Sequence, residues 1–213
     1  MAAKASGHEQ RTMKINLPTA LTLLRLLIVP WVVVLLCLEF SARDAIVAAA
    51  FALAVATDWF DGWLARRWNQ TSAFGAFLDP VADKLLVCVV LVMLVYQEPF
   101  LWIALPAVVI VGREITVSAL REWMAELGER AAIAVGALGK YKTTIQMGAM
   151  LLMLYDLSEP RIGLYWLGVV SLWIAALLTI YSMVRYLQTA WLRLQTQEQD
   201  KTPKQRADLE APR

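Results

Sequence analysis

The sequence predicts an all-α integral membrane protein with six transmembrane helices. Hydrophobic residues make up 59% of the 213 residues, and the mean hydropathy is +0.55. Charged residues account for 18%, below the roughly 25% that is usual in soluble domains. Long apolar runs recur along the chain between short polar segments, which is the pattern of a polytopic helical protein. The nine tryptophans suit anchoring at membrane interfaces.

The apolar runs set out the elements in chain order. A polar and mildly basic segment, residues 1–14, comes first, and we expect it to form a tail or an interfacial helix. A single six-helix domain is expected over residues 15–194, with the fourth helix kinked or shifted by Pro106. Residues 195–213 are polar and predicted to be a disordered tail. The six spans are expected at residues 17–38, 45–66, 74–96, 100–123, 131–155 and 162–186.

Basic residues are distributed unevenly over the segments outside these spans. The two terminal segments and the second and fourth connections hold most of the Lys and Arg residues. The other connections offer only Arg43 and Arg161. The positive-inside rule therefore places both termini and the second connection in the cytoplasm. The net charge of only +2 gives no indication of a nucleic-acid partner.

Four aspartates gather around the second connection, between two long apolar runs. Asp58 and Asp61 are three residues apart, and on a helix they share one face. Asp79 and Asp83, four residues apart, do the same. An unpaired Asp near the bilayer interior costs at least ~2.5–3.5 kcal/mol, so these residues need a cation or a water-filled cavity. Capped helix ends with solvated acids would not require this spacing in both segments.

The number and type of these ligands indicate a hard cation. Carboxylate oxygens favour Mg²⁺, Mn²⁺ or Ca²⁺ over a soft metal. Two facing pairs could hold two ions ~3.5–4 Å apart, an arrangement suited to phosphoryl chemistry. Gly62 and Gly75 leave room for a nucleotide against the backbone, or they only permit close helix packing. Arg66 could bind a diphosphate or could anchor the cytoplasmic end of its helix.

Basic residues outside the acidic motif form two further groups. Arg25 in the first span either points inward to phosphates or acids, or snorkels to the interface. Downstream, Arg113 and Arg121 are eight residues apart and share a helical face. Lys140 and Lys142 are two apart and do not. These four residues could bind a substrate phosphate, for which Arg forks are suited, or they only set the topology.

The spacing D-x2-D-G-x2-A-R-x8-G-x3-D-x3-D over residues 58–83 resembles the signature of the CDP-alcohol phosphatidyltransferase family, with every signature residue present. The resemblance implies a six-helix homodimer in a bacterial inner membrane, with a site for Mg²⁺ or Mn²⁺, two ions in number, that faces the cytoplasm. It also implies that Asp83 is the base on the acceptor hydroxyl, a role that spacing alone does not separate from Asp79. The implied metal ligands are Asp58, Asp61, Asp79 and Asp83.

The runs 56–84 and 113–144 are similar to family members whose acceptor is sn-glycerol 3-phosphate. The implied reaction is attack by the acceptor's 1-hydroxyl on the β-phosphorus of CDP-diacylglycerol, giving phosphatidylglycerophosphate and CMP. Two alternatives stay open: another alcohol, such as inositol phosphate, serine or a phospholipid, and a divalent-cation transporter. A transporter would explain the acids but not the glycines or the basic residues. The implied binding residues are Asp58, Asp61, Gly62, Arg66, Gly75, Asn16, Thr22 and Arg25 for CDP-diacylglycerol, and Arg113, Arg121, Lys140 and Lys142 for glycerol 3-phosphate.

Overall fold

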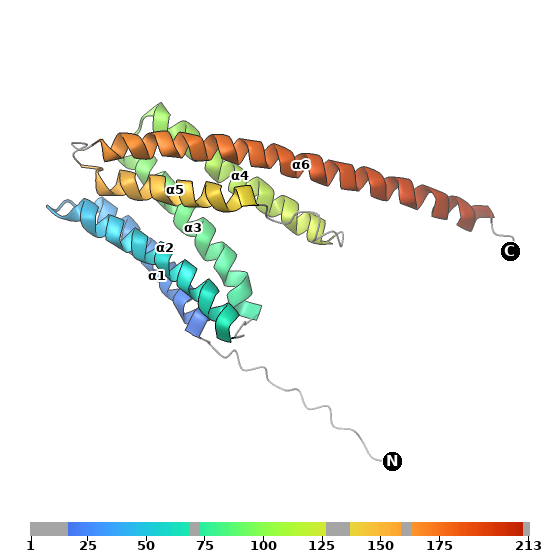
Figure 1. Cartoon of the computed structure of the whole chain (residues 1–213), viewed down its shortest axis with the longest axis horizontal. Helices are drawn as coiled ribbons and strands as arrows, with labels where there is room; N and C mark the ends of the chain where they lie inside the picture. Colours follow the sequence, from blue (N-terminus) through green and yellow to red (C-terminus); the bar gives the residue numbers. More distant parts are fainter. Residues whose placement is uncertain (1–16, 69–72, 127–136, 159–162, 211–213) are drawn as a thin grey trace, which may run out of the picture.

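A computed structural model describes the backbone of residues 17–68, 73–126, 137–158 and 163–210. All the regular structure in these ranges is α-helical, which confirms the predicted all-α fold. Figure 1 shows the helices, which are α1 (Leu17–Cys37), α2 (Arg43–Trp68), α3 (Ala73–Gln97), α4 (Leu101–Glu126), α5 (Ala137–Tyr155) and α6 (Leu164–Glu210).

The helix ends agree with the predicted spans to within a few residues, except at two places. Residues 131–136, expected to open the fifth span, lie outside the described residues. Helix α6 continues to Glu210, across the segment predicted to be a disordered tail. The physical reason is local: this segment is rich in Gln, Glu, Lys and Arg, which have high helix propensity and need no packing partner to extend an existing helix. The domain limits at residues 15 and 194 stay predictions.

By length and composition, three helices of the described part are suited to cross a membrane: Ala20–Cys37 in α1, Leu101–Glu126 and Leu164–Leu192 in α6. Helices α2 and α3 carry the aspartates of the motif, and α5 carries two lysines, so their apolar stretches are shorter. The number of transmembrane helices, predicted to be six, therefore stays a prediction.

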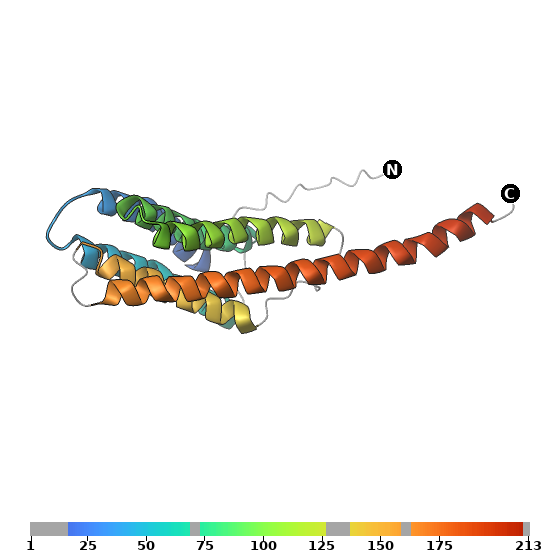
Figure 2. The ribbon, with the colours of Figure 1, turned by 90° about the horizontal axis from the view of Figure 1, so that it is seen from above.

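The helices form two layers that are seen edge-on in Figure 2. One layer contains α1, α3 and α4, and the other contains α2, α5 and α6. Contacts of α1 with α2, α4 with α6 and α3 with α5 join the layers. The last part of α6 runs beyond the bundle as a single helix (Figure 1).

The apolar core fills one end of this bundle. Consecutive helices run in opposite directions, so the core uses the second half of α1, α3 and α5 and the first half of α2, α4 and α6. Most of the buried polar side chains lie toward the other end of the bundle: Thr22, Arg25, Thr57, Arg113, Lys142, Gln146 and Thr179. Asp156 is the exception, because it is buried at the apolar end, where it accepts from the backbone N–H of Tyr165. The fold thus separates an apolar end from a polar end, and the acidic motif lies at the polar end.

Candidate active site

One turn of α1 binds the acidic motif of α2 and α3. Arg25 is completely buried, and its Nη1 forms an ion pair with Oδ1 of Asp58 at 2.8 Å. The same nitrogen donates to Oδ1 of Asp83. One turn earlier, the Thr22 hydroxyl donates to Oδ1 of Asp79. Because Thr22 and Arg25 are three residues apart and Asp79 and Asp83 four, each pair shares a face and the two faces meet.

Arg25 therefore lies inward among the acids and does not snorkel to an interface. Its two partner carboxylates are less enclosed: the side chains of Asp58 and Asp83 are 47% and 43% exposed. These carboxylates thus have room for a further ligand on the side that faces away from Arg25.

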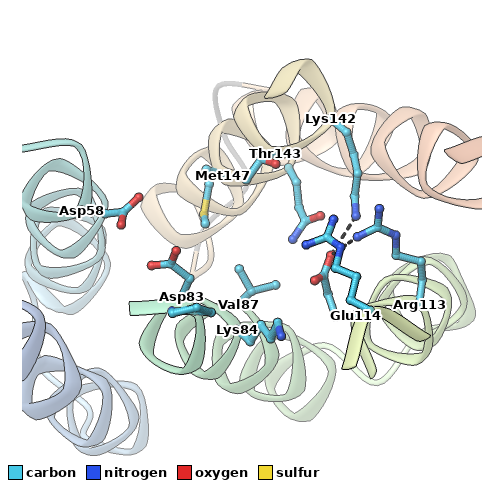
Figure 3. A pocket seen from close by; sticks show the side chains of 12 residues that line it. Asp58, Asp83, Lys84, Val87, Arg113, Glu114, Lys142, Thr143 and Met147 are labelled. Carbon is cyan, nitrogen blue, oxygen red and sulfur yellow. Dashed lines mark hydrogen bonds and ion pairs between the residues drawn. The ribbon is translucent and has the colours of Figure 1, made fainter. Parts of the chain in front are cut away.

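Asp58 and Asp83 open onto a cavity of about 270 Å³ at the polar end of the bundle. In Figure 3 these carboxylates lie on one wall of the cavity, and basic side chains from α4 and α5 lie on the opposite wall. The cavity brings the two motifs that are far apart in sequence into one site. Its lining residues are Asp58, Pro80, Asp83, Lys84, Val87, Arg113, Glu114, Arg121, Lys142, Thr143, Gln146 and Met147.

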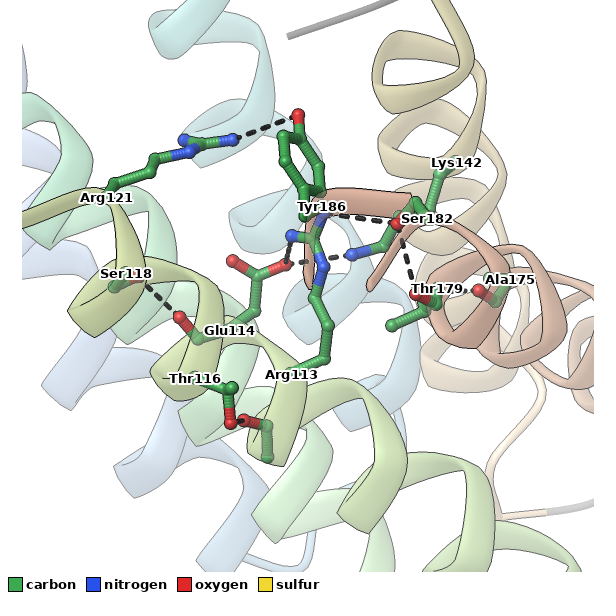
Figure 4. A network of polar contacts seen from close by, with 11 residues as sticks. Arg113, Glu114, Thr116, Ser118, Arg121, Lys142, Ala175, Thr179, Ser182 and Tyr186 are labelled. Carbon is green, nitrogen blue, oxygen red and sulfur yellow. Dashed lines mark hydrogen bonds and ion pairs between the residues drawn. The ribbon is translucent and has the colours of Figure 1, made fainter. Parts of the chain in front are cut away.

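The basic wall is organised by Glu114. Its Oε1 accepts from Nη1 of Arg113 at 2.9 Å and from Nζ of Lys142 at 2.9 Å (Figure 4). Arg113 and Lys142 are both buried, and Nη2 of Arg113 also donates to Oγ of Ser182 on α6 at 3.3 Å. Two buried cations thus share one carboxylate, which leaves a net positive charge at the cavity wall. Such a surplus favours an anion in the cavity.

Helix α6 supplies a tyrosine that lies between the two arginines of α4. The guanidinium carbons of Arg113 and Arg121 are 5.8 and 5.6 Å from the centre of the Tyr186 ring. Nη2 of Arg121 also lies 3.5 Å from the Tyr186 hydroxyl. Cation–π attraction to one ring holds both guanidinium groups on the same side of α4, as their spacing predicts.

An apolar groove between α2 and α5 adjoins the polar cavity. It has a volume of about 590 Å³. It shares Asp58, Thr143 and Met147 with the polar cavity, so the two spaces meet at the acidic motif. Most of its other lining residues are apolar: Phe51, Ala52, Val55, Ala56, Trp59, Gly148 and Leu151. A ligand with a polar phosphate end and an apolar tail fits this pair of spaces.

Several predicted site residues do not line the polar cavity, or their side chains are not among those that the structure describes. Asp79 contacts Thr22 but does not line the polar cavity. Gly75 is buried in the first turn of α3. Asn16 lies outside the described residues. The side chains of Asp61, Arg66 and Lys140 are not described, although the helices that carry them are, and the same holds for the surroundings of Gly62.

Two described carboxylates of the acidic motif, those of Asp58 and Asp83, fit a divalent cation. Asp58 and Asp83 direct Oδ1 atoms at a single cationic nitrogen, and nearly half of each side chain is exposed. Carboxylate oxygens that converge in this way are the donors a hard cation prefers. Among the described side chains, no three Asp, Glu, His or Cys residues lie close enough together to form a complete site. The four-aspartate ligand set therefore stays a prediction.

Some residues of the cavity, and some that contact its basic wall from outside, were not predicted from the sequence. The sequence could have predicted Glu114 as part of the site, because a carboxylate in an apolar helix beside Arg113 needs a compensating charge. Gln146 was detectable from its place four residues after Lys142, on the same face of α5. No sequence pattern marked Ser182 or Tyr186, because their role depends on how α6 packs against α4.

These features define a class of protein: a multi-pass membrane protein that holds paired carboxylates, a buried basic cluster and an apolar groove around one internal cavity. Comparison with known proteins gives the family. The model of the CDP-alcohol phosphatidyltransferase family matches residues 15–193, and the chain belongs to this family, as its signature predicts. Members of the family generally depend on a divalent metal.

Several bacterial relatives are similar over most of their length. A CDP-diacylglycerol–glycerol-3-phosphate 3-phosphatidyltransferase of Salmonella choleraesuis (strain SC-B67) is 48% identical over 178 residues, which cover 84% of this chain and 96% of the relative. The enzyme of the same name from Yersinia enterocolitica is 48% identical over 179 residues, 84% of this chain and 97% of the relative. That from Shigella flexneri is 47% identical over 178 residues, with 84% and 96% covered.

Proposed function

We propose that the protein transfers a phosphatidyl group from CDP-diacylglycerol to sn-glycerol 3-phosphate, releasing CMP and forming phosphatidylglycerophosphate. The observation that carries this proposal is the single cavity with Asp58 and Asp83 on one wall and Arg113, Arg121 and Lys142 on the other. The reaction needs such a cavity, because a diphosphate and a second phosphate must come together. The names of the relatives support glycerol 3-phosphate as the acceptor.

The CDP-diacylglycerol site is proposed at the acidic wall. Its phosphates lie beside Asp58 and Asp83, which Arg25 holds in place from α1, and Thr22 holds the neighbouring Asp79. The apolar groove beside Asp58 takes an acyl chain of the donor. The remaining residues proposed for this site are Asp61, Gly62, Arg66 and Gly75 of the signature, together with Asn16, which directly precedes the first predicted span.

Two Mg²⁺ or Mn²⁺ ions are proposed at this wall, held by Asp58 and Asp83 together with Asp61 and Asp79. Bound there, divalent ions neutralise diphosphate charge and orient the leaving group. The carboxylates of Asp58 and Asp83 position the donor, and the fully buried Arg25 fixes the distance between them.

The acceptor phosphate is proposed to bind the basic wall. Arg113 and Lys142 are already ordered by Glu114, so little side-chain entropy is lost when a phosphate binds. Arg121 lines the same cavity and adds a second planar fork. Lys140 completes the proposed set.

Asp83 is proposed to take the proton from the acceptor's 1-hydroxyl. As that oxygen bonds to the β-phosphorus, the bond between this phosphorus and the bridging oxygen breaks, and CMP leaves with the bridging oxygen. A primary alcohol is a poor nucleophile at neutral pH, so a carboxylate within hydrogen-bond reach raises the rate. The half-exposed side chain of Asp83 can then release the proton to water in the cavity.

The site is proposed to face the cytoplasm of a bacterial inner membrane, with both termini on that side, because the basic residues lie on the same side as the acidic motif. A homodimer is proposed from the family resemblance. Cross-linking of tagged copies in native membranes tests the dimer, and labelling of cysteines placed at either terminus tests the orientation.

The proposed activity is tested with purified protein, CDP-diacylglycerol and a panel of acceptors. We expect CMP release that depends on glycerol 3-phosphate and on Mg²⁺ or Mn²⁺, and that stops with excess chelator. Faster CMP release with inositol phosphate, serine or a phospholipid would reassign the acceptor. No CMP release with any acceptor would refute the phosphatidyl transfer itself.

A further inference from the structure

Gln146 is a buried residue of the polar cavity that has no role in the proposed reaction. Gln146 is 2% exposed and lines the polar cavity. Its Oε1 is buried and has no hydrogen-bond partner among the described residues. A buried polar atom left unpaired costs free energy, and its replacement by an apolar residue would relieve that cost. An unpaired amide oxygen on a residue that lines a substrate cavity therefore indicates a ligand that pairs with it.

The position of Gln146 on α5 determines which part of a bound ligand its side chain can contact. It lies four residues after Lys142, so both side chains lie on one face of α5. In Figure 3 Lys142 reaches the basic wall, and Met147 lies toward Asp83. Gln146 belongs to the turn of α5 between these two. Its amide thus lines the cavity between the proposed phosphate site and the proposed base.

We propose that the Gln146 amide binds the C2 hydroxyl of the acceptor and makes the enzyme selective for it. This inference rests on the proposed function. Glycerol 3-phosphate carries its phosphate on C3 and its reacting hydroxyl on C1, so C2 and its hydroxyl lie between them. With the phosphate at Arg113 and Lys142 and C1 at Asp83, the C2 hydroxyl comes beside α5. A hydroxyl both donates and accepts, so it pairs with Oε1 or with the amide nitrogen.

This pairing gives Gln146 a role in specificity. The basic wall binds any phosphate, and Asp83 acts on any primary hydroxyl within reach. An acceptor without a middle hydroxyl satisfies both but leaves the buried amide oxygen of Gln146 unpaired. Sites built around a substrate hydroxyl discriminate strongly against analogues that lack it, because the polar group of the protein then stays without a partner.

The test compares glycerol 3-phosphate with 3-hydroxypropyl phosphate, which lacks only the C2 hydroxyl. We expect the wild-type enzyme to prefer glycerol 3-phosphate in kcat/KM by about 10- to 100-fold. Gln146→Met has nearly the same size and no hydrogen-bonding group, and we expect it to lose most of this preference. The loss should come from slower reaction with glycerol 3-phosphate, with little change for the deoxy acceptor. Gln146→Ala serves as a second variant if the first does not fold.

A matched control is Gln97→Met, which replaces a glutamine at the apolar end of the bundle whose amide donates to the Leu36 carbonyl at 2.6 Å. This control should retain the wild-type preference. Equal use of both acceptors by the wild-type enzyme would overturn the inference, as would a Gln146 variant that slows both acceptors equally. If the wild-type enzyme shows no CMP release with glycerol 3-phosphate, the proposed function itself fails, which is a distinguishable result.

Discussion

Asp83 has two proposed roles, metal ligand and base, and its contacts in the structure bear on both. Its Oδ1 is bound to Arg25, and its side chain is 43% exposed to the cavity. An aspartate that is fixed by Arg25 and exposed to the cavity can lie within reach of an acceptor hydroxyl. Substitution by asparagine keeps the size and one oxygen of the side chain but removes its ability to take a proton.

We expect Asp83→Asn to abolish turnover, by about 10²- to 10⁴-fold in kcat, while CDP-diacylglycerol binding stays close to that of wild type. Turnover and binding are measured over a titration of Mg²⁺ or Mn²⁺. Recovery of near-normal kcat at high metal would show that Asp83 is a ligand and not the base. Asp44→Asn, at the opposite end of the bundle where Asp44 accepts from Ser158, is the matched control.

Glu114 reduces the repulsion between two buried cations, Arg113 and Lys142, because it forms an ion pair with each of them. Replacing it with glutamine leaves Arg113 and Lys142 in the cavity wall without their shared carboxylate. Removal of one partner from a buried ionic group typically lowers the free energy of unfolding by about 3–5 kcal/mol. A phosphate-bearing ligand can supply the missing negative charge. Because such a ligand binds only the folded state, it raises the free energy of unfolding of the variant.

We therefore expect Glu114→Gln to unfold at a lower temperature than wild type in detergent, and glycerol 3-phosphate to raise its unfolding temperature more than that of wild type. Glu122→Gln, an exposed residue on the same helix, is the control and should behave as wild type. An unfolding temperature of Glu114→Gln equal to that of wild type would contradict the structural role of Glu114.

At the scale of elements, the sequence predicted which faces are polar but not which faces meet. The four-residue spacing of the acids of α3 and the eight-residue spacing of the arginines of α4 correctly placed each pair on a single face, because helix periodicity is a local property. That Thr22 and Arg25 contact this particular face of α3 depends on how three helices pack, which periodicity does not determine. The contribution of α6 through Ser182 and Tyr186 was missed for the same reason.

The contact of Tyr186 on α6 with the arginines of α4 leads to a prediction at the scale of elements. We expect Tyr186→Ala to raise KM for glycerol 3-phosphate severalfold and to leave KM for CDP-diacylglycerol nearly unchanged, because cation–π contacts contribute about 0.5–2 kcal/mol. Tyr186→Phe keeps the ring and loses only a long contact of 3.5 Å, so it should resemble wild type. Steady-state kinetics with each substrate varied in turn makes the comparison. Equal effects on both KM values would count against a separate acceptor site.

At the scale of the whole molecule, an antiparallel bundle brings the acidic motif and the basic wall together at one end. The even number of predicted spans and the distribution of Lys and Arg were enough to predict that the acids and the basic set lie on the same side. The cavity between them required the structure, because its walls come from residues as far apart as Asp58 and Lys142. The helical extension of α6 past residue 194 was not predicted, since polar composition alone does not separate a single helix from a disordered tail.

The extension allows a test of the domain limits. Helix α6 packs against α4 as far as Ala190, which is buried beside Met124, and no residue beyond this lines the polar cavity among the described side chains. We expect a chain that ends at residue 194 to keep kcat/KM within about twofold of the full-length protein, because kinetic effects of this size correspond to less than ~0.5 kcal/mol. Its CMP release in membranes is the measurement. A large loss of activity would place part of the site, or of a dimer contact, in the extension.

The ion pairs of Arg25 also bear on how the chain enters the membrane. An arginine inside an apolar helix raises the free energy of insertion by about 2.5–3.5 kcal/mol, and an aspartate has a similar effect. Arg25 lies in α1, and its carboxylate partners come from the next two helices to be synthesised. In the predicted six-span topology the opposite charges therefore reach the bilayer directly after Arg25, and the predicted hairpin of α1 and α2 already contains one ion pair. We therefore expect Arg25 to compensate Asp58 and Asp83 during insertion without a divalent ion.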